Sequence, residues 1–352
     1  MKFLFGIIAP LALVAVACAG IALWISHELQ EEVTLAPSAQ HLEVARGETL
    51  DQILKRLADA GTIRSALPLR AYLKLSKKSP VVKAGNYTFP ASISPLGVLQ
   101  KLEEGGEFDR LTVIEGWNRF DIAAAAAKVP SLKLANPDEA VVLMNDTSAI
   151  SDLDPGASNL EGYLFPDTYF IVPDSTPKEL ISEMVKKFRD VWTADLQARA
   201  KKSGRSVHDL VTIASIIETE AKLKEEQPIV ASVIYNRLKI NMPLSMDSTI
   251  VYASKLAGAW KNDGKVYLSD VERDSPYNTR KAVGLPPGPV GSPGLGALKA
   301  AANPANTKYL YYVRNPYRND GAHNFYENIE DFSGGVAMLR SWERKQQASQ
   351  PR

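Results

Sequence analysis

The stretch SVHDLVTIASIIETEAK, residues 206–222, indicates how the C-terminal part of the chain folds. Ser206 and Asp209 have the spacing of a helix-capping box. Apolar residues recur behind them with the spacing of one helical face, at Leu210, Ile213, Ala214 and Ile217. The sequence therefore predicts a helix that begins at about residue 206 and buries one face.

Two carboxylates interrupt the apolar end of this predicted helix. At about 100° per residue, Glu218 lies one step beyond Ile217, at the edge of the buried face, and Glu220 points in another direction. A carboxyl group beside Ala, Ser and Ile side chains loses hydration, which raises its pKa, as a general acid at neutral pH requires. Glu218 is a candidate acid, although a solvated helix-edge Glu has the same pattern. Glu220 either holds the following loop or contacts substrate.

The N-terminus carries the longest uncharged stretch of the chain. Residues 3–25, FLFGIIAPLALVAVACAGIALWI, contain no charge and are long enough to cross a bilayer as a helix of about 20 residues. A cleavable signal peptide is the alternative, but the apolar run continues past the small residues of AVACAG. Cys18 suggests a lipoprotein, except that Ala15 stands where a large aliphatic residue is expected. We therefore expect residues 1–27 to form a cytoplasmic N-terminus and a transmembrane helix.

The charges predict the location and the ligand class of the rest of the chain. The acidic HELQEEVT follows the span and only Lys2 precedes it, so the remainder is expected outside the cytoplasm, attached to the cell (inner) membrane. Of 41 basic residues, all but Lys2 lie beyond the span, where they balance 40 acidic residues. A domain without net charge has no electrostatic reason to bind nucleic acid, and uncharged ligands such as sugars are favoured.

The 352 residues, 45% of them apolar, allow one large or two moderate domains. After a linker over residues 28–39, residues 40–106 read as a compact α+β unit of strand, helix, helix, strand and helix. Thr49 and Gln52 have capping-box spacing, and Gly61 ends the first helix. Its expected buried face consists of Leu50, Ile53, Leu54 and Leu57.

Residues 107–345 form the second predicted domain, followed by a tail over residues 346–352. VIEGWNRFDIAAAAA, residues 113–127, repeats the strand, Gly and helix order of VARGETLDQIL, with Gly116 at the place of Gly47. Helix-like stretches are expected over about 177–202, 206–222 and 228–238, and KYLYYVRN is expected to be a strand. GLPPGPVGSPGLG, residues 284–296, is a long ordered loop by composition.

Several sequence blocks follow one another in a recognisable order. EGYLFPDTYFI precedes IASIIETEAK, and the blocks that come after it are PIVASVIYNRL, MPLSMDSTIVYA, SPYNTRKAVGLPPGPVGSPGLGALKAAANP and YLYYV. Together they resemble the membrane-anchored endolytic murein transglycosylases of the YceG-like family, over nearly the whole chain. The resemblance implies an α+β fold with a single N-terminal transmembrane helix, a LysM-like α+β domain and a mixed α/β catalytic domain.

The resemblance also implies the chemistry. Glu218 would be both the catalytic acid and the base: it protonates the bond between N-acetylmuramic acid and N-acetylglucosamine, then takes the proton of the muramic 6-hydroxyl as a 1,6-anhydro ring closes. This reaction needs neither an external water nor a second carboxylate, unlike typical glycosidases. No cofactor or metal is implied, and the four scattered histidines lack HExxH spacing.

A set of substrate-binding residues is implied in the same way: Glu161, Tyr163, Glu220, Asn236, Ser245, Asp247, Thr249, Tyr277 and Asn278. For some of these residues a purely structural role stays open. Asn236 is alternatively a helix cap, Asp247 the start of the next helix, and Glu161 either a turn residue or a second acid. Ser245, Met246 and Arg280 depart from the residue types usual in the family, which puts these subsite contacts in question.

The expected partners are nascent peptidoglycan strands and, by resemblance, the glycan polymerases and transpeptidases that make them, with cleavage ending strand elongation. The main alternative is a non-catalytic, membrane-anchored scaffold that binds peptidoglycan. A pyridoxal phosphate lyase is a second alternative, but the export signal argues against a normally cytosolic cofactor enzyme. A serine hydrolase is disfavoured because the GxSxG elbow is absent from the sequence.

Overall fold

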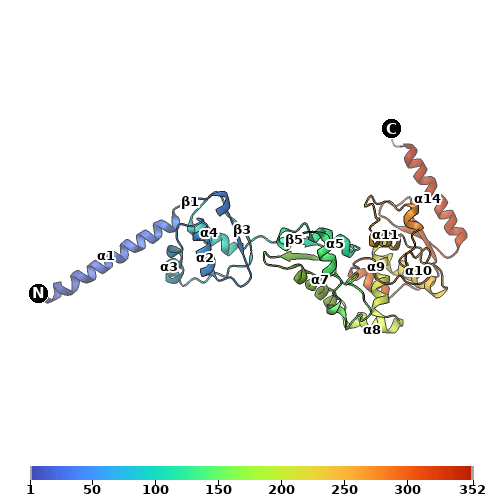
Figure 1. Ribbon diagram of the computed structural model, residues 1–352, viewed down its shortest axis with the longest axis horizontal. Coiled ribbons are helices and arrows are strands. Elements are labelled where there is room, and N and C mark those ends of the chain that lie inside the picture. The colour runs from blue at the N-terminus through green and yellow to red at the C-terminus, as the bar shows by residue number, and fades with distance from the viewer. Residues whose placement is uncertain (1, 350–352) are drawn as a thin grey trace. The chain divides into compact units, whose positions relative to one another are not determined.

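The computed structural model describes residues 2–349, and the side chains of residues 1–12, 14, 347 and 349–352 lie outside that description. The chain divides into two compact units. Unit 1 consists of Met1–Arg110 and Phe170–Ser175, and unit 2 of Leu111–Tyr169 and Thr176–Arg352. The described residues form a mostly helical α+β fold whose strands pair in two-stranded sheets (Figure 1). The α+β class is confirmed, and the second domain, expected to be mixed α/β, is mostly helical with two-stranded sheets in its described residues.

Unit 1 contains two short antiparallel sheets packed against helices. One sheet pairs β1 with β4, and the other pairs β2 with β3, so that Leu42 lies opposite Tyr87. The chain order β2, α2, α3, β3 is the predicted order of strand, helix, helix and strand. The elements of this unit are α1 (Lys2–Gln30), β1 (Val33–Thr34), η1 (Pro37–Ala39), β2 (His41–Val44), α2 (Leu50–Asp59), α3 (Leu67–Ser76), β3 (Gly85–Thr88), β4 (Ser92–Ile93) and α4 (Pro95–Glu104).

The local signals at α2 are confirmed. The side chain of Thr49 accepts the backbone N–H of Gln52, and the Gln52 side chain accepts the backbone N–H of Thr49, which completes the capping box. Gly61 follows the helix at φ 78°, a left-handed conformation that favours glycine. The sequence therefore specifies both ends of this helix locally.

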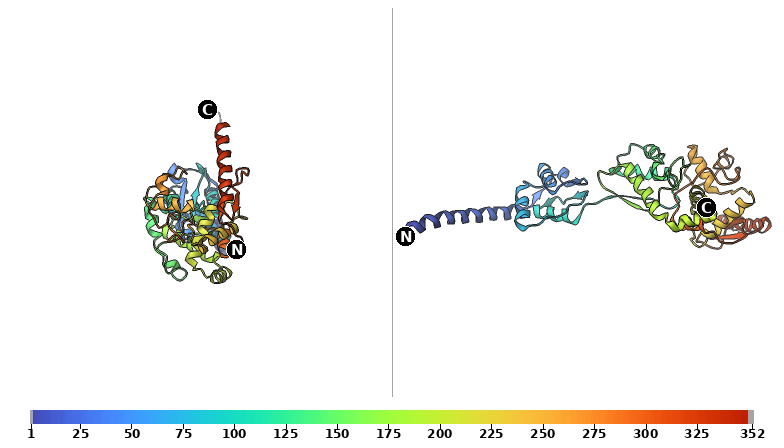
Figure 2. Two further views of the ribbon diagram at one scale, coloured as in Figure 1. Left: turned by 90° about the vertical axis from the view of Figure 1, so that its right-hand side faces the viewer. Right: turned by 90° about the horizontal axis from the view of Figure 1, so that it is seen from below.

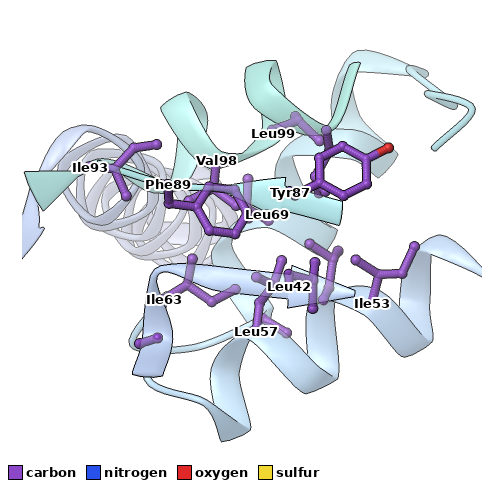
Figure 3. Close-up of a cluster of buried hydrophobic side chains, with 14 of the residues drawn as sticks. Leu42, Ile53, Leu57, Ile63, Leu69, Tyr87, Phe89, Ile93, Val98 and Leu99 are labelled. Carbon is purple, nitrogen blue, oxygen red and sulfur yellow. The ribbon is translucent and has the colours of Figure 1, made fainter. Parts of the chain in front are cut away.

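The core of unit 1 is apolar. Ile53 and Leu57 of α2 are fully buried, and Leu42, Tyr87 and Leu99 are nearly so. Figure 3 shows these side chains directed towards one another from α2, the two strands and α4. Because a buried aliphatic or aromatic side chain contributes roughly 1.5–3 kcal/mol, this cluster supplies the main stabilisation of the unit.

The helix α1 ends in this core. Leu29 is buried against it, whereas Leu13, Val16 and Leu23, further towards the N-terminus, are each more than 70% exposed. Among the described residues, no helix combines the length and the apolar character that crossing a membrane requires. The predicted span over residues 3–25 lies partly outside the described side chains, and it stays a prediction.

Unit 2 is a group of helices with two short strand pairs. β5 pairs with β6, and β7 pairs antiparallel with β8. The elements are β5 (Asp109–Thr112), α5 (Arg119–Ala126), η2 (Pro130–Leu132), α6 (Pro137–Leu143), η3 (Ser148–Ile150), β6 (Thr168–Ile171), α7 (Pro177–Val191), α8 (Ala194–Ser203), α9 (Val207–Glu220), α10 (Gln227–Lys239), α11 (Asp247–Leu256), α12 (Leu268–Val271), α13 (Leu295–Ala302), β7 (Tyr311–Arg314), β8 (His323–Tyr326) and α14 (Ile329–Ser349). Terminal residues of β5 and β6 are assigned to unit 1.

The helix α9 occupies the centre of this group. It packs against α13, α10, α11 and α8, and its residues 210–217 are all buried. The yellow-to-orange segments, which include these helices, gather together in the right-hand view of Figure 2. A helix that is buried almost all round is expected at the core of a domain, so α9 is positioned rigidly.

Three boundaries differ from the prediction. The stretch 177–202 is two helices, because α7 ends at Val191 and the Thr193 side chain caps α8 by accepting the N–H of Leu196. The predicted tail over 346–352 is helical at its start, since α14 continues to Ser349. The Gly and Pro loop over 284–296 ends in the first residues of α13.

Candidate active site

Glu218 lies in the last turn of α9. The helix begins after Ser206, whose Oγ accepts the N–H of Asp209 at 3.0 Å, and it ends at Glu220. Ile217 is fully buried, and Glu218 is half-buried one step further around the helix. The predicted helix and the half-buried position of Glu218 are therefore confirmed, whereas burial of only one face was wrong, because residues 210–217 are all buried.

The carboxylate of Glu218 meets the start of α13. The backbone N–H of Gly294 donates to Glu218 Oε2 at 2.8 Å, and α13 begins at the next residue. The N-terminus of a helix carries a partial positive charge, which favours an adjacent anion. Gly294 thus offers one oriented hydrogen bond to the ionised form of Glu218.

The Gly and Pro loop is fastened to its surroundings by backbone hydrogen bonds. Ser292 accepts the N–H of Gly116 at 2.8 Å and donates its own N–H to the carbonyl of Trp117 at 2.7 Å. The N–H of Val290 donates to the hydroxyl of Ser215, on α9, at 3.0 Å. A Cβ on Gly291 would lie 2.6 Å from the Gly116 carbonyl oxygen, so only glycine permits this approach. The loop, the segment before α5 and α9 therefore form one rigid frame.

Glu115 also lies at this frame, although no sequence pattern singled it out. A Cβ built on Gly294 would lie 3.2 Å from Glu218 Oε2 and 3.7 Å from Glu115 Oε1, so these two oxygens are no more than about 7 Å apart. Glu115 is exposed. The match of Gly116 to Gly47 located the turn, but nothing in the sequence indicates that the turn reaches α9.

The pKa of Glu218 reflects opposing influences. Burial has the largest effect and raises the pKa of this carboxyl, and the negative charge of Glu115 raises it further. The Gly294 hydrogen bond and the positive charge of Lys224 lower it. The net pKa lies above the ordinary value for glutamic acid. An acid in this environment holds its proton at higher pH than an exposed glutamic acid, and its conjugate base still has a hydrogen-bond donor. The group is suited to donate a proton and to accept one back.

Glu220 faces the opposite side of α9, as expected. Its Oε1 accepts the hydroxyl of Ser248 at 3.0 Å, and its Oε2 accepts the hydroxyl of Tyr312 at 2.9 Å. Burial raises the pKa of Glu220, and the hydrogen bonds from Tyr312 and Ser248 partly counteract this. Glu220 therefore joins α9 to α11 and β7, which is more than the loop-holding role considered from the sequence.

A cavity of about 470 Å³ opens beside Glu220. It brings together three of the predicted substrate-binding residues, Glu220, Ser245 and Asp247. Asp247 begins α11 and pairs with Arg280 at 2.6 Å. The cavity is lined by Glu220, Arg237, Met242, Ser245, Met246, Asp247, Arg280, Tyr311, Tyr312, Val313 and Phe332. All three departures from the family pattern, Ser245, Met246 and Arg280, are among them.

Three other predicted residues organise backbone. Asn236 does not cap a helix: it lies inside α10, and its Nδ2 donates to the carbonyls of Thr307 and Tyr309. Asn278 is fully buried and donates to the carbonyls of Val271 and Arg273. Thr249 is also fully buried, and it donates to the Met246 carbonyl at 2.7 Å. Direct contact of the two buried residues with a glycan would require rearrangement.

The remaining predictions concern Glu161, Tyr163 and Tyr277. Glu161 is 2% exposed, and both of its oxygens accept the backbone N–H of Arg119, at 3.2 and 3.1 Å. Burial raises the pKa of Glu161 to about 7. Tyr163 is buried and donates to Asp154. The ring of half-buried Tyr277 lies 4.9 Å from that of Tyr252, tilted by 55°. The groups that act on the pKa of Glu218 are Gly294, Glu115 and Lys224, and Glu161 is not among them.

Several known proteins are similar to this chain over most of its length. The family model described as the YceG-like family matches residues 42–337. A protein of Bacillus subtilis (strain 168) named endolytic murein transglycosylase is 34% identical over 290 residues, which is 78% of each chain. One of the same name from Streptococcus pneumoniae (strain D39) is 32% identical over 84% of this chain and 57% of its own.

A solved structure agrees with this result. A crystal structure of a yceG-like protein from Listeria monocytogenes has a TM-score of 0.57 and 29% sequence identity, covering 86% of this chain and 98% of its own. The matched region includes both units, and the family model alone spans more than half of the chain. The chain therefore belongs to the YceG-like family.

Proposed function

We propose that this protein is an endolytic murein transglycosylase, a lytic transglycosylase that cuts peptidoglycan strands internally with Glu218 as its acid and base. The observation that carries this proposal is the half-buried Glu218 carboxyl on a rigid helix, bonded to the Gly294 N–H. The relatives named endolytic murein transglycosylase support the same assignment. A binding scaffold offers no reason to hold a carboxyl with a raised pKa at this place.

In the first step Glu218 donates its proton to the glycosidic oxygen between N-acetylmuramic acid and N-acetylglucosamine. Since Oε2 accepts the Gly294 N–H, Oε1 remains to carry the proton. Bond cleavage leaves positive charge on the muramic anomeric carbon, and the new Glu218 carboxylate is stabilised by Gly294 and the start of α13. Because burial raises the pKa of Glu218, this carboxyl keeps its proton at higher pH than an exposed glutamic acid does.

In the second step the Glu218 carboxylate takes the proton of the muramic 6-hydroxyl. The hydroxyl oxygen then bonds to the anomeric carbon and closes a 1,6-anhydro ring, so Glu218 returns to its protonated form. The nucleophile belongs to the substrate, and no activated water is needed. This explains how one acid carries a reaction for which most glycosidases use two.

Mass spectrometry of uncrosslinked glycan strands incubated with the full-length chain tests this function. The wild type is expected to give 1,6-anhydro ends within the strand. Glu218→Gln is expected to reduce their formation by at least about a hundredfold, because general acid and base catalysis contributes 10²–10⁴-fold. Glu330→Gln, a matched change at an exposed residue of α14, should cut like the wild type.

Other products would assign a different function. Reducing ends from the wild type would mean hydrolysis and a water-activating base. Binding of glycan by both proteins without any cleavage would support the non-catalytic scaffold.

We further propose that the chain is anchored to the cell membrane through residues 3–25, with the residues after 27 on the outer side. The uncharged sequence of this stretch supports the anchor, as do the exposed Leu13, Val16 and Leu23 and the interfacial Trp24. Retention of the full-length chain in carbonate-washed membranes, and release of a chain that begins at residue 28, are the expected results.

The proposed place of action is nascent glycan beside the membrane. The strand, helix, helix, strand order of β2, α2, α3 and β3 supports a LysM-like, glycan-binding role for unit 1. A tether keeps the catalytic unit within reach of new polymer. Cleavage there would end strand elongation, and glycan polymerases and transpeptidases are the proposed partners. Longer glycan strands in cells that carry Glu218→Gln are the expected result.

A further inference from the structure

Glu115 is the second carboxylate of the candidate active site. It precedes Gly116, whose backbone N–H is bonded to Ser292, in the segment between β5 and α5. A Cβ on Gly116 would lie 4.0 Å from Glu218 Cγ, and one on Gly294 would lie 3.0 Å from Glu115 Cγ. The two glutamates thus flank Gly294 from two different elements, and the backbone that carries Glu115 cannot move away without breaking its bond to Ser292.

The groups that act electrostatically on Glu218 come from three places in the described structure. Glu115 lies before α5, Lys224 lies between α9 and α10, and the Gly294 N–H lies at the start of α13. Lys224 and Glu115 are both exposed and carry opposite charges. Glu115 is therefore the acidic neighbour that opposes ionisation of Glu218.

We propose that Glu115 is a positioning residue for the reaction, whose ionised carboxylate keeps the proton on Glu218 until the glycosidic bond breaks. The inference rests on the proposed transglycosylase function. Two like charges no more than about 7 Å apart repel each other, so Glu218 ionises readily only when positive charge develops at the sugar. After cleavage the same repulsion favours return of a proton to Glu218 from the 6-hydroxyl. The first and second steps therefore both benefit from one fixed negative charge.

Chemical labelling of Glu218 tests this without relying on turnover. Dicyclohexylcarbodiimide reacts with protonated carboxyl groups, and peptide mass spectrometry of the full-length chain reports the labelled fraction of Glu218 at each pH. Glu115→Gln removes the repelling charge, so the pH at which half of Glu218 is labelled should fall, by about one unit for charges at this distance. Glu115→Asp keeps the negative charge, so its labelling midpoint should stay close to that of the wild type.

Two variants control the sign and the location of the effect. Lys224→Gln removes a positive charge that attracts ionised Glu218, so the pH at which half of Glu218 is labelled should rise. Glu330→Gln removes a negative charge from α14, away from Glu218, and should leave the midpoint unchanged. An unchanged midpoint in Glu115→Gln, or equal shifts in Glu115→Gln and Glu330→Gln, would overturn the proposal.

The pH dependence of anhydro-end formation gives the kinetic counterpart. Glu115→Gln should move the alkaline limb of the rate profile to lower pH. The rate of anhydro-end formation should therefore fall about tenfold on that limb and only slightly at acidic pH. A loss equal at every pH would mean a structural role. Reducing ends that disappear in Glu115→Gln would make Glu115 a water-activating base, which also contradicts the proposal. A labelling shift without any anhydro ends would instead refute the transglycosylase function and leave the electrostatic coupling intact.

Discussion

The two units differ in what they bury. In unit 1, among the residues that the structure describes, Thr62 is the one buried polar side chain, and it donates to the Ala39 carbonyl. Unit 2 buries many polar side chains, five of which belong to charged residue types: Asp154, Glu161, Glu226, Arg237 and Asp270. Both units have apolar cores, so the need to form a core does not by itself explain why only unit 2 buries many polar side chains.

Buried charges cost free energy unless they are hydrogen-bonded, and each one fixes the backbone that supplies its partners. In unit 2 such groups join segments that are distant in sequence, as Glu226 does by accepting the N–H of His323 at 2.9 Å. A unit that binds can rely on an apolar core, whereas one that must hold a reactive carboxyl in place needs these polar connections. The following predictions test that contrast, in order of decreasing effect.

Arg237→Ala should destabilise unit 2 by about 4 kcal/mol, as expected for loss of a buried charged group. The guanidinium donates from Nε to the Leu310 carbonyl at 2.6 Å and from Nη1 to the Leu244 carbonyl at 2.5 Å, and alanine leaves both acceptors unpaired. Urea unfolding measures the change. The control is Arg56→Ala in unit 1, where the exposed pair with Glu48 should account for less than about 1 kcal/mol. Equal losses of stability in Arg237→Ala and Arg56→Ala would contradict the difference proposed between the two units.

Leu57→Ala should destabilise unit 1 by about 3.5 kcal/mol, because it opens a cavity in an apolar core. Leu57 is 0% exposed in α2. Hydrogen exchange of the α2 amides should accelerate while exchange in α9 stays unchanged. Leu75→Ala, at a side chain that is 77% exposed, is the matched control and should have almost no effect. Acceleration of α9 by Leu57→Ala would show that the units do not unfold independently.

Glu161 should make the stability of unit 2 depend on pH. Burial raises its pKa from 4.5 to about 7, so its stabilising contribution is complete below about pH 4.5 and is lost as pH rises through 7. The loss amounts to about 3 kcal/mol at 1.36 kcal/mol per unit. Glu161→Gln, which cannot ionise, should flatten this decline in urea unfolding between pH 4.5 and 8. A parallel decline in both proteins would contradict the assignment.

His208 should give a smaller dependence at higher pH. Burial alone lowers its pKa, but the bonds to Asp154 at 2.6 Å and to the Pro287 carbonyl at 2.8 Å outweigh burial and raise it. The contribution is therefore complete below the ordinary value of about 6.5 and is lost as pH rises through the raised pKa.

His208→Gln should lower the free energy of unfolding by about 1 kcal/mol at pH 6 and by less at pH 9. Urea unfolding at the two pH values measures this difference. A larger effect of the variant at pH 9 than at pH 6 would show that neutral His208 makes these bonds.

Sequence reasoning worked best where the signal is local. The Thr49 and Gln52 capping box, the Ser206 cap and the apolar face of α9 all depend on residues within four positions of one another, and all are present. The edge position of Glu218 follows from the same geometry. The break between α7 and α8 was missed because the Thr193 cap is a weak signal inside a strongly periodic stretch.

The sequence was least informative where the partner is distant. Glu161 was chosen as a possible second acid, yet the nearby carboxylate is Glu115, which is 103 positions before Glu218 in the printed numbering. Asn236 was considered a cap, yet it binds carbonyls more than 70 positions away. Local patterns do not contain these pairings, because loop packing creates them.

The uncharged N-terminal stretch can be read directly from the sequence, whereas the choice of Glu218 came from the resemblance to the YceG-like family. By itself, the sequence determined the α+β class and a helix close to the bounds of α9. These follow from hydrophobic periodicity and capping, which act over one or two turns. The tertiary structure alone decided that Gly294 donates to Glu218, that Glu115 lies beside it and that Glu220 faces a separate cavity. The first two facts depend on a Gly and Pro loop held by Ser215, Gly116 and Trp117. The pKa of a carboxyl is set by the groups that the fold places within a few ångströms of it.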